Sequence, residues 1–108
     1  MDLKQLAARL ELEEDEFLEM MNLFVEVTES DLRKLQSAME REELQEAVFA
    51  AHSIKGAAAN LGLTGISEKA KRAEAALRGR QLDEAREAVR GIQEKLFEVT
   101  RDLSQGER

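Results

Sequence analysis

Apolar residues recur every three or four positions along most of the chain, and this spacing predicts helices. The first segment covers residues 2–10, where Asp2 is placed to cap the first turn. A much longer segment covers residues 14–39 and begins among four consecutive acids, which the positive end of a helix dipole favours. Its inward positions follow the alternation of a helix-bundle seam: Leu18, Met21, Val25, Thr28, Leu32, Leu35 and Met39.

The first half of the 14–39 helix carries more apolar surface than one seam needs. The additional apolar side chains on its flanks are Phe17, Met20, Leu23, Phe24 and Val27. Such a surface is either covered by another part of the chain or left for a partner. We expect residues 2–10 to cover it in the main.

Three more helices follow. The first covers residues 42–61 and ends at Gly62, and its seam is Leu44, Ala47, Ala51, Ile54, Ala58 and Leu61. The second ends at Gly79 and directs Ile66, Ala70, Ala73 and Leu77 toward the core. The last covers residues 82–103, with Leu82, Ala85, Val89, Ile92, Leu96, Val99 and Leu103 as its seam. Residues 104–108 are predicted to be a frayed tail.

Four long helices with short connections pack most simply as an antiparallel up-down-up-down four-helix bundle, with the short N-terminal helix across one end. The composition agrees with an all-α protein, because proline is absent and strong helix formers are abundant. A length of 108 residues with 43% hydrophobic residues suits a single domain over 1–108, with its core at about 13–103.

Charge and residue usage exclude several classes of function. A net charge of −7 argues against nucleic acid as a partner, because phosphate backbones are bound by clustered cations. No apolar stretch approaches the ~18 residues of a membrane span, and the N-terminus does not resemble a signal peptide, so we expect a cytoplasmic protein. With no cysteine and one histidine, we expect no metal and no cofactor, and a metal- or haem-binding bundle ranks last among the alternatives.

His52, the single histidine, is the candidate reactive group. At ~100° per residue it lies ~110° from the middle of its helix seam, which places it on an accessible flank. A neutral imidazole has a ring nitrogen with a free lone pair and is therefore a nucleophile. Lys55, on the next turn, would disfavour the protonated ring and attract the negative charge of a transferred phosphate.

The residues around His52 leave space on its C-terminal side. Gly56 lies on the next turn and Ala59 on the turn after it. A glycine inside a helix costs roughly 1 kcal/mol relative to alanine, and access of another protein to the imidazole explains its presence. Phe49, one turn before His52, either docks a partner or packs under a neighbouring helix. Gln45, one turn earlier still, is a second possible docking residue.

The segment from His52 to Gly62 resembles the signature of histidine phosphotransfer (HPt) domains. That signature is a histidine, any residue, an aliphatic residue, lysine, glycine and two small residues, followed later by an aliphatic residue and glycine. The chain matches it with His52, Ile54, Lys55, Gly56, Ala57, Ala58, Leu61 and Gly62. The similarity in helix pattern extends over about residues 13–103.

The resemblance implies a phosphohistidine carrier in a two-component phosphorelay. His52 would accept a phosphoryl group from a receiver-domain phosphoaspartate or a kinase and pass it to another receiver, while Lys55 stabilises the phosphate. The implied partners are response-regulator receiver domains and a sensor histidine kinase, with Mg²⁺ on the receiver. In HPt domains the neighbouring surface of this helix helps to dock the receiver, so the resemblance implies that the apolar surface of the 14–39 helix is partly covered and partly left for a partner. The chain itself would be a monomer without autokinase activity.

Two other hypotheses remain open. The chain could be a non-catalytic helical adaptor in which His52 is incidental. It could also be the phosphoacceptor domain of a chemotaxis-type kinase, a class close to HPt domains. The sequence ends without a kinase region, which favours a free-standing carrier or an excised fragment.

Overall fold

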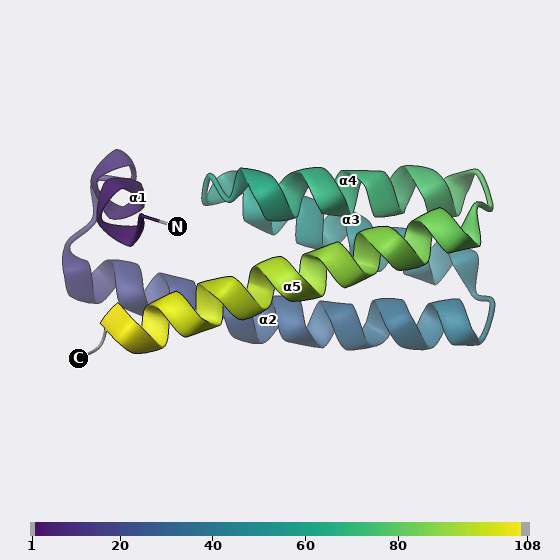
Figure 1. The fold of residues 1–108 in the computed structure, drawn as a ribbon, viewed down its shortest axis with the longest axis horizontal. Helices are drawn as coiled ribbons and strands as arrows, with labels where there is room; N and C mark the ends of the chain where they lie inside the picture. The colour runs from purple at the N-terminus through teal and green to yellow at the C-terminus, as the bar shows by residue number, and fades with distance from the viewer. Residues whose placement is uncertain (1, 107–108) are drawn as a thin grey trace.

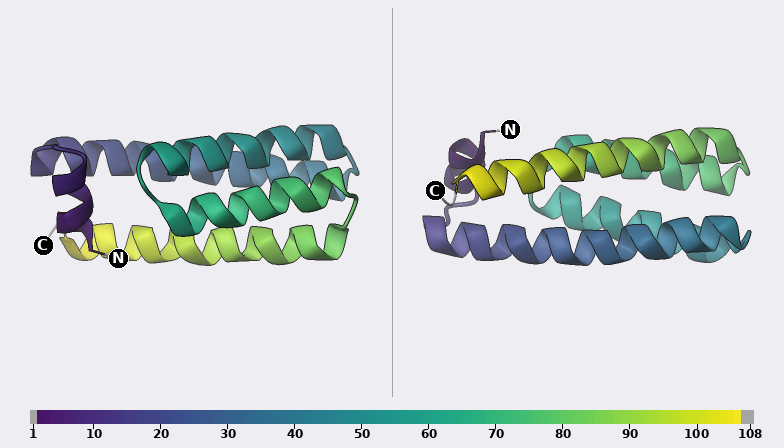
Figure 2. Two further views of the ribbon diagram at one scale, coloured as in Figure 1. Left: turned by 90° about the horizontal axis from the view of Figure 1, so that it is seen from above. Right: turned by 60° about the horizontal axis from the view of Figure 1, so that its bottom comes forward.

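The computed structural model describes residues 2–106 and has five helices in this range and no strand (Figure 1). The helices are α1 (Leu3–Arg9), α2 (Glu14–Glu40), α3 (Leu44–Asn60), α4 (Thr64–Arg78) and α5 (Leu82–Gly106). Helices α2 to α5 alternate in direction, and α1 lies across one end of the bundle (Figures 1 and 2). The predicted all-α, up-down-up-down four-helix bundle with a short additional helix is therefore confirmed.

The four long helices differ in length, and this difference creates a place for α1. Helices α2 and α5 have 27 and 25 residues, whereas α3 and α4 have 17 and 15. The longer pair extends beyond the shorter pair at the end where α1 packs (Figure 1). There Leu6 is buried, and its side chain approaches Gly62 in the turn after α3. Within residues 2–106 no helix combines the length and apolar character that a bilayer span requires.

The predicted seams of α3, α4 and α5 are buried, except that Leu44 and Leu82 are only half-buried. The seam of α2 differs from the prediction: Phe17, Phe24 and Ala38 are buried, whereas Leu18, Val25 and Met39 are half-buried. Because the first half of α2 is apolar on several sides, its periodicity does not decide which stripe faces the core. Packing against both α3 and α5 decides it.

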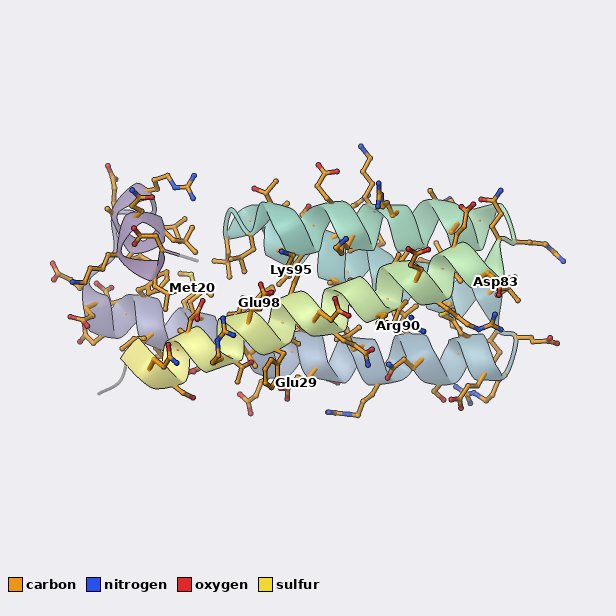
Figure 3. The ribbon with its side chains drawn as sticks, viewed as in Figure 1. Met20, Glu29, Asp83, Arg90, Lys95 and Glu98 are labelled. Carbon is orange, nitrogen blue, oxygen red and sulfur yellow. The ribbon has the colours of Figure 1, made fainter. Side chains whose placement is uncertain are left out.

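Helix α1 does not cover the whole apolar surface of α2. Its residues line a hollow with the α3–α4 turn and α5, while Met20 of α2 is half-buried near α1 (Figure 3). Leu23 and Val27 keep 59% and 44% of their surface exposed. The expectation that residues 2–10 cover these two side chains was wrong, because α1 turns across the end of the bundle instead of lying along α2.

The connections explain where the helix limits differ from the prediction. After each of α1 to α4, one residue adopts a left-handed conformation: Glu11, Glu42, Gly62 and Arg80. At the end of α2, for example, the Glu43 N–H donates to Ala38 O at 2.8 Å and the Glu42 N–H donates to Met39 O at 3.1 Å, which is a Schellman motif. Helix α3 therefore begins at Leu44, two residues later than predicted.

At the end of α4, Gly79 is the C-cap and Arg80 takes the left-handed conformation. Helix α5 continues to Gly106, three residues beyond its predicted end. The predicted frayed tail at 104–108 is thus helical over 104–106, and residues 107–108 lie outside the described part of the chain.

Candidate functional site

Helix α3 carries the candidate site, and its composition lets its neighbours come close. Its buried residues are four alanines and one isoleucine: Ala47, Ala50, Ala51, Ile54 and Ala58. The distance between packed helices depends on the side chains at the contact, so an alanine face allows a short separation. As a result, side chains of α2 and α4 form hydrogen bonds to side chains of α3 next to His52.

The imidazole of His52 is exposed, and one of its two nitrogens is hydrogen-bonded. The side chain keeps 62% of its surface accessible, and its Nδ1 lies 3.0 Å from Oε2 of Glu74 on α4. A carboxylate only accepts hydrogen bonds, so Nδ1 carries the proton in this contact. In the neutral ring the lone pair is then on Nε2. The ring therefore has a fixed orientation and one available nucleophilic nitrogen.

Glu74 is the centre of this site. Its side chain is 9% exposed, and besides His52 it contacts two cations. Lys55 Nζ donates to Oε1 at 2.8 Å, and Arg78 Nη2 donates to Oε2 at 3.0 Å. The hydrogen bond from Lys55 lowers the pKa of Glu74 to about 2 against the opposing effect of burial, with further contributions from Arg78 and His52. Glu74 is therefore a carboxylate at neutral pH.

Lys55 lies on the turn after His52, as predicted, but it does not stand alone beside the ring. Its ammonium group is paired with Glu74, and the charged group in contact with the ring is the Glu74 carboxylate. Arg78 lies one turn after Glu74 on α4 and keeps 66% of its side chain exposed. One carboxylate thus contacts the imidazole, and two cations contact that carboxylate.

The remaining predicted site residues share the outer face of α3. Gly56 is exposed, and a Cβ atom added to it would meet no other heavy atom within 4 Å. Ala59 and Gln45 are also exposed. Phe49 keeps 67% of its surface accessible, so the alternative in which it packs under a neighbouring helix was wrong. The structure therefore brings all of these residues to one open surface around His52.

Sequence reasoning missed Glu74, Arg78 and one contact with α2. In that contact, Ser53 Oγ donates to Oδ2 of Asp31 at 2.9 Å, which ties α2 to α3 beside the imidazole. The sequence pattern that could have pointed to Glu74 is an acidic residue between the core positions Ala73 and Leu77, followed four residues later by an arginine. That pattern indicates a partly buried ion pair but does not identify its third partner on another helix.

Comparison with known proteins places these observations in a family. Residues 19–105 match the family model described as Hpt domain. The chain belongs to the Hpt domain family. Its fold also matches the crystal structure of histidine-containing phosphotransfer protein B (HptB) from Pseudomonas aeruginosa. The two chains share 28% identity, with a TM-score of 0.83 over 94% of this chain and 88% of HptB. No curated protein matches the sequence.

Membership of the Hpt family supports a carrier role in phosphorelays. Hpt domains are phosphocarriers and not enzymes in the usual sense, and they interact with receiver domains and kinases. The resemblance seen in the sequence is thus confirmed at the level of the family.

The pKa of Glu74 predicts a pH-dependent contribution to stability. Because the folded-state pKa, about 2, lies below the ordinary value of 4.5, the contribution is complete above pH 4.5 and is lost as the pH falls toward 2. We expect Glu74→Gln to lower the free energy of unfolding at pH 7 by about 2 kcal/mol. This loss is smaller than the pKa shift alone implies, because solvent screens the exposed partners of Glu74. Urea unfolding of both proteins between pH 7 and pH 2 measures the difference.

Glu87→Gln is the matched control, because Glu87 is exposed on α5 and has no ion-pair partner within residues 2–106. It should change stability by less than about 0.5 kcal/mol. A Glu74→Gln effect that persists unchanged at pH 2 would contradict the assignment of this carboxylate as the charged centre of the site.

Proposed function

We propose that the chain is a phosphohistidine carrier in which Nε2 of His52 receives and donates the phosphoryl group. One observation carries this proposal: an exposed imidazole whose Nδ1 is bound by Glu74, one helical turn before the open space at Gly56. An incidental surface histidine, as in the adaptor hypothesis, needs no buried carboxylate to orient it. The geometry therefore favours the carrier over the adaptor.

The transfer step follows from the groups present. The lone pair on Nε2 attacks the phosphorus of a receiver phosphoaspartate, the N–P bond forms, and the P–O bond to the aspartate breaks. The aspartate leaves as a carboxylate, and the proton on Nδ1 stays in the hydrogen bond to Glu74. Positive charge that develops on the ring is balanced by the Glu74 carboxylate at 3.0 Å. Reversal of the same step passes the group to another receiver.

Lys55 and Arg78 are the groups of this chain that would stabilise the transferred phosphoryl group. Both are already ion-paired with Glu74, and both keep part of their surface exposed. If either long side chain rotates, its cation can reach a phosphoryl oxygen, while the other cation stays paired with Glu74. Phosphoryl transfer depends mainly on such positioning and charge stabilisation.

The remaining parts of the reaction are assigned to the partners. In this scheme the receiver domain supplies the phosphoaspartate and Mg²⁺, and a sensor histidine kinase supplies the phosphoryl group from ATP, so the chain has no autokinase activity. It acts as a monomer in the cytoplasm, where these partners are found. A receiver domain docks against exposed apolar side chains of the two helices, Leu23 and Val27 of α2 and Phe49 of α3, which we call the docking surface; a fourth exposed apolar side chain, Phe97, lies on α5.

Labelling by phosphorylated receiver domains tests the proposal. We expect at least one receiver in a panel to transfer label to the chain in an acid-labile, base-stable form. His52→Gln should abolish the labelling completely, because no other histidine is present. The free energy of unfolding of this variant should fall by no more than about 1 kcal/mol, because the ring gives up its hydrogen bond to Glu74 but is mostly exposed. Equal labelling of His52→Gln and the parent would refute the assignment.

The open space at Gly56 predicts that stability and transfer respond in opposite directions to a larger side chain. Gly56→Gln should raise the free energy of unfolding by up to about 1 kcal/mol, because glycine is unfavourable inside a helix. The same change should slow phosphotransfer on the order of tenfold, because the side chain would occupy the approach to Nε2. Stopped-flow transfer rates and urea unfolding measure the two effects.

The control for Gly56→Gln is Ala75→Gln. Ala75 is exposed on α4 and lines a hollow with α5, away from the face that carries Gly56. This variant adds similar bulk and should transfer phosphate at the parent rate. If Gly56→Gln also transfers at the parent rate, the access role of Gly56 is wrong.

A further inference from the structure

The exposed surface of α2 beside His52 changes its charge along the helix. Toward the N-terminus of α2, the residues that line a hollow include three carboxylates and no cation: Leu12, Glu16, Glu19, Met20, Asn22, Leu23 and Glu26. We refer to this hollow as the acidic end. Its lining includes the exposed Leu23, which belongs to the docking surface described above.

Toward the C-terminus of α2, a second hollow lies between α2 and α3. Its lining includes three cations and two carboxylates: Asp31, Arg33, Lys34, Ser37, Arg41, Glu46, Phe49, Ala50 and Ser53. We refer to it as the basic end. It is adjacent to the site, because Phe49 is one turn before His52 and Ser53 is the next residue.

Arg33 and Lys34 are the two charged side chains of the basic end that are most accessible to a partner. Both are exposed, and neither has an ion-pair partner within residues 2–106. By contrast, Asp31 accepts a hydrogen bond from Ser53 at 2.9 Å, and Arg41 lies 3.5 Å from the carboxylate of Glu43. Arg33 and Lys34 therefore keep their charges free to pair with a partner at a hollow that Ser53, the residue after His52, also lines.

The separation of the two ends matches the size of one partner domain. At 1.5 Å per residue, Glu19 and Arg41 are ~33 Å apart along α2, which is about the diameter of a small domain. The Asp31–Ser53 contact lies between them and marks the axial position of His52. A single receiver domain centred on the imidazole would therefore cover both ends.

We propose that this charge reversal selects the orientation and identity of the receiver domain. A receiver domain that fits this surface carries carboxylates opposite Lys34 and cations opposite Glu19, on either side of its phosphoaspartate. A receiver turned around, or one with the opposite charge pattern, brings like charges together at both ends and is rejected. This inference rests on the proposed carrier function and adds the chemistry of its partner.

Three charge reversals test the proposal, using the receiver that transfers phosphate fastest to the parent chain. Lys34→Glu changes the basic end and Glu19→Lys changes the acidic end, with opposite effects on net charge. Arg90→Glu is the control: it changes net charge as Lys34→Glu does, but Arg90 lies on α5 and lines a hollow between α5 and α2 (Figure 3). Urea unfolding confirms that all three variants are folded.

We expect Lys34→Glu and Glu19→Lys each to lower the second-order rate constant for transfer on the order of tenfold at low ionic strength. Both effects should shrink in about 1 M salt, where the Debye length is about 3 Å. Arg90→Glu should transfer at the parent rate, and transfer within the saturated complex should be unchanged in all variants.

Other outcomes would overturn the proposal in distinct ways. Equal slowing by Lys34→Glu and Arg90→Glu, with faster transfer by Glu19→Lys, would show that net charge alone matters. Slowing by only one of the two end variants, or by neither, would refute selection by a two-ended surface while leaving the carrier function intact. A parent chain that takes phosphate from no receiver would refute the carrier function itself, and this inference with it.

Discussion

The hydrogen-bonded carboxylate of Glu74 is the interaction on which the rest of the site depends. It lies almost fully buried between α3 and α4, where a charge is costly unless it is paired and hydrogen-bonded. Three donors satisfy it: the ring of His52, the ammonium of Lys55 and the guanidinium of Arg78. The same contacts join two helices, orient the imidazole and hold two cations against the carboxylate that binds it. Stability and chemistry therefore share one group, and removing it would leave the donors of both helices without their acceptor.

The helix that carries the site departs from ordinary helix and surface preferences at the positions where a partner must approach. Gly56 weakens α3 by roughly 1 kcal/mol and fills no packing need, since a Cβ atom there would meet nothing. Phe49 exposes a large apolar side chain to solvent, as do Leu23 and Val27 on α2. Departures of this kind concentrate at functional surfaces because the compensating interaction comes from the bound partner. The buried alanine face of α3 serves packing within the chain. Its small side chains allow α2 and α4 to pack closely, so that Asp31 and Glu74 reach hydrogen-bonding distance of side chains on α3.

Periodicity predicted the number, order and packing of the helices because each of α3, α4 and α5 has one clear apolar stripe. It misassigned the stripe of α2, where Phe17 and Phe24 compete with Leu18 and Val25 and only tertiary packing decides between them. It also placed the start of α3 too early, because the left-handed conformation of Glu42 has no glycine to announce it. The reactive side of the site was visible in sequence, since His52, Lys55 and Gly56 are neighbours on one helix. Glu74 was not, because its contact with His52 joins residues 22 positions apart on two helices, and local spacing contains no information on that distance.

The central claim is that Glu74 holds the proton on Nδ1 and leaves Nε2 of His52 as the phosphoacceptor. Nuclear magnetic resonance of the phosphorylated chain with ¹⁵N-labelled histidine tests it directly, because the single histidine gives one set of ring signals. The account predicts phosphorus coupling to Nε2 and a proton retained on Nδ1. Phosphorus coupling to Nδ1 would contradict it.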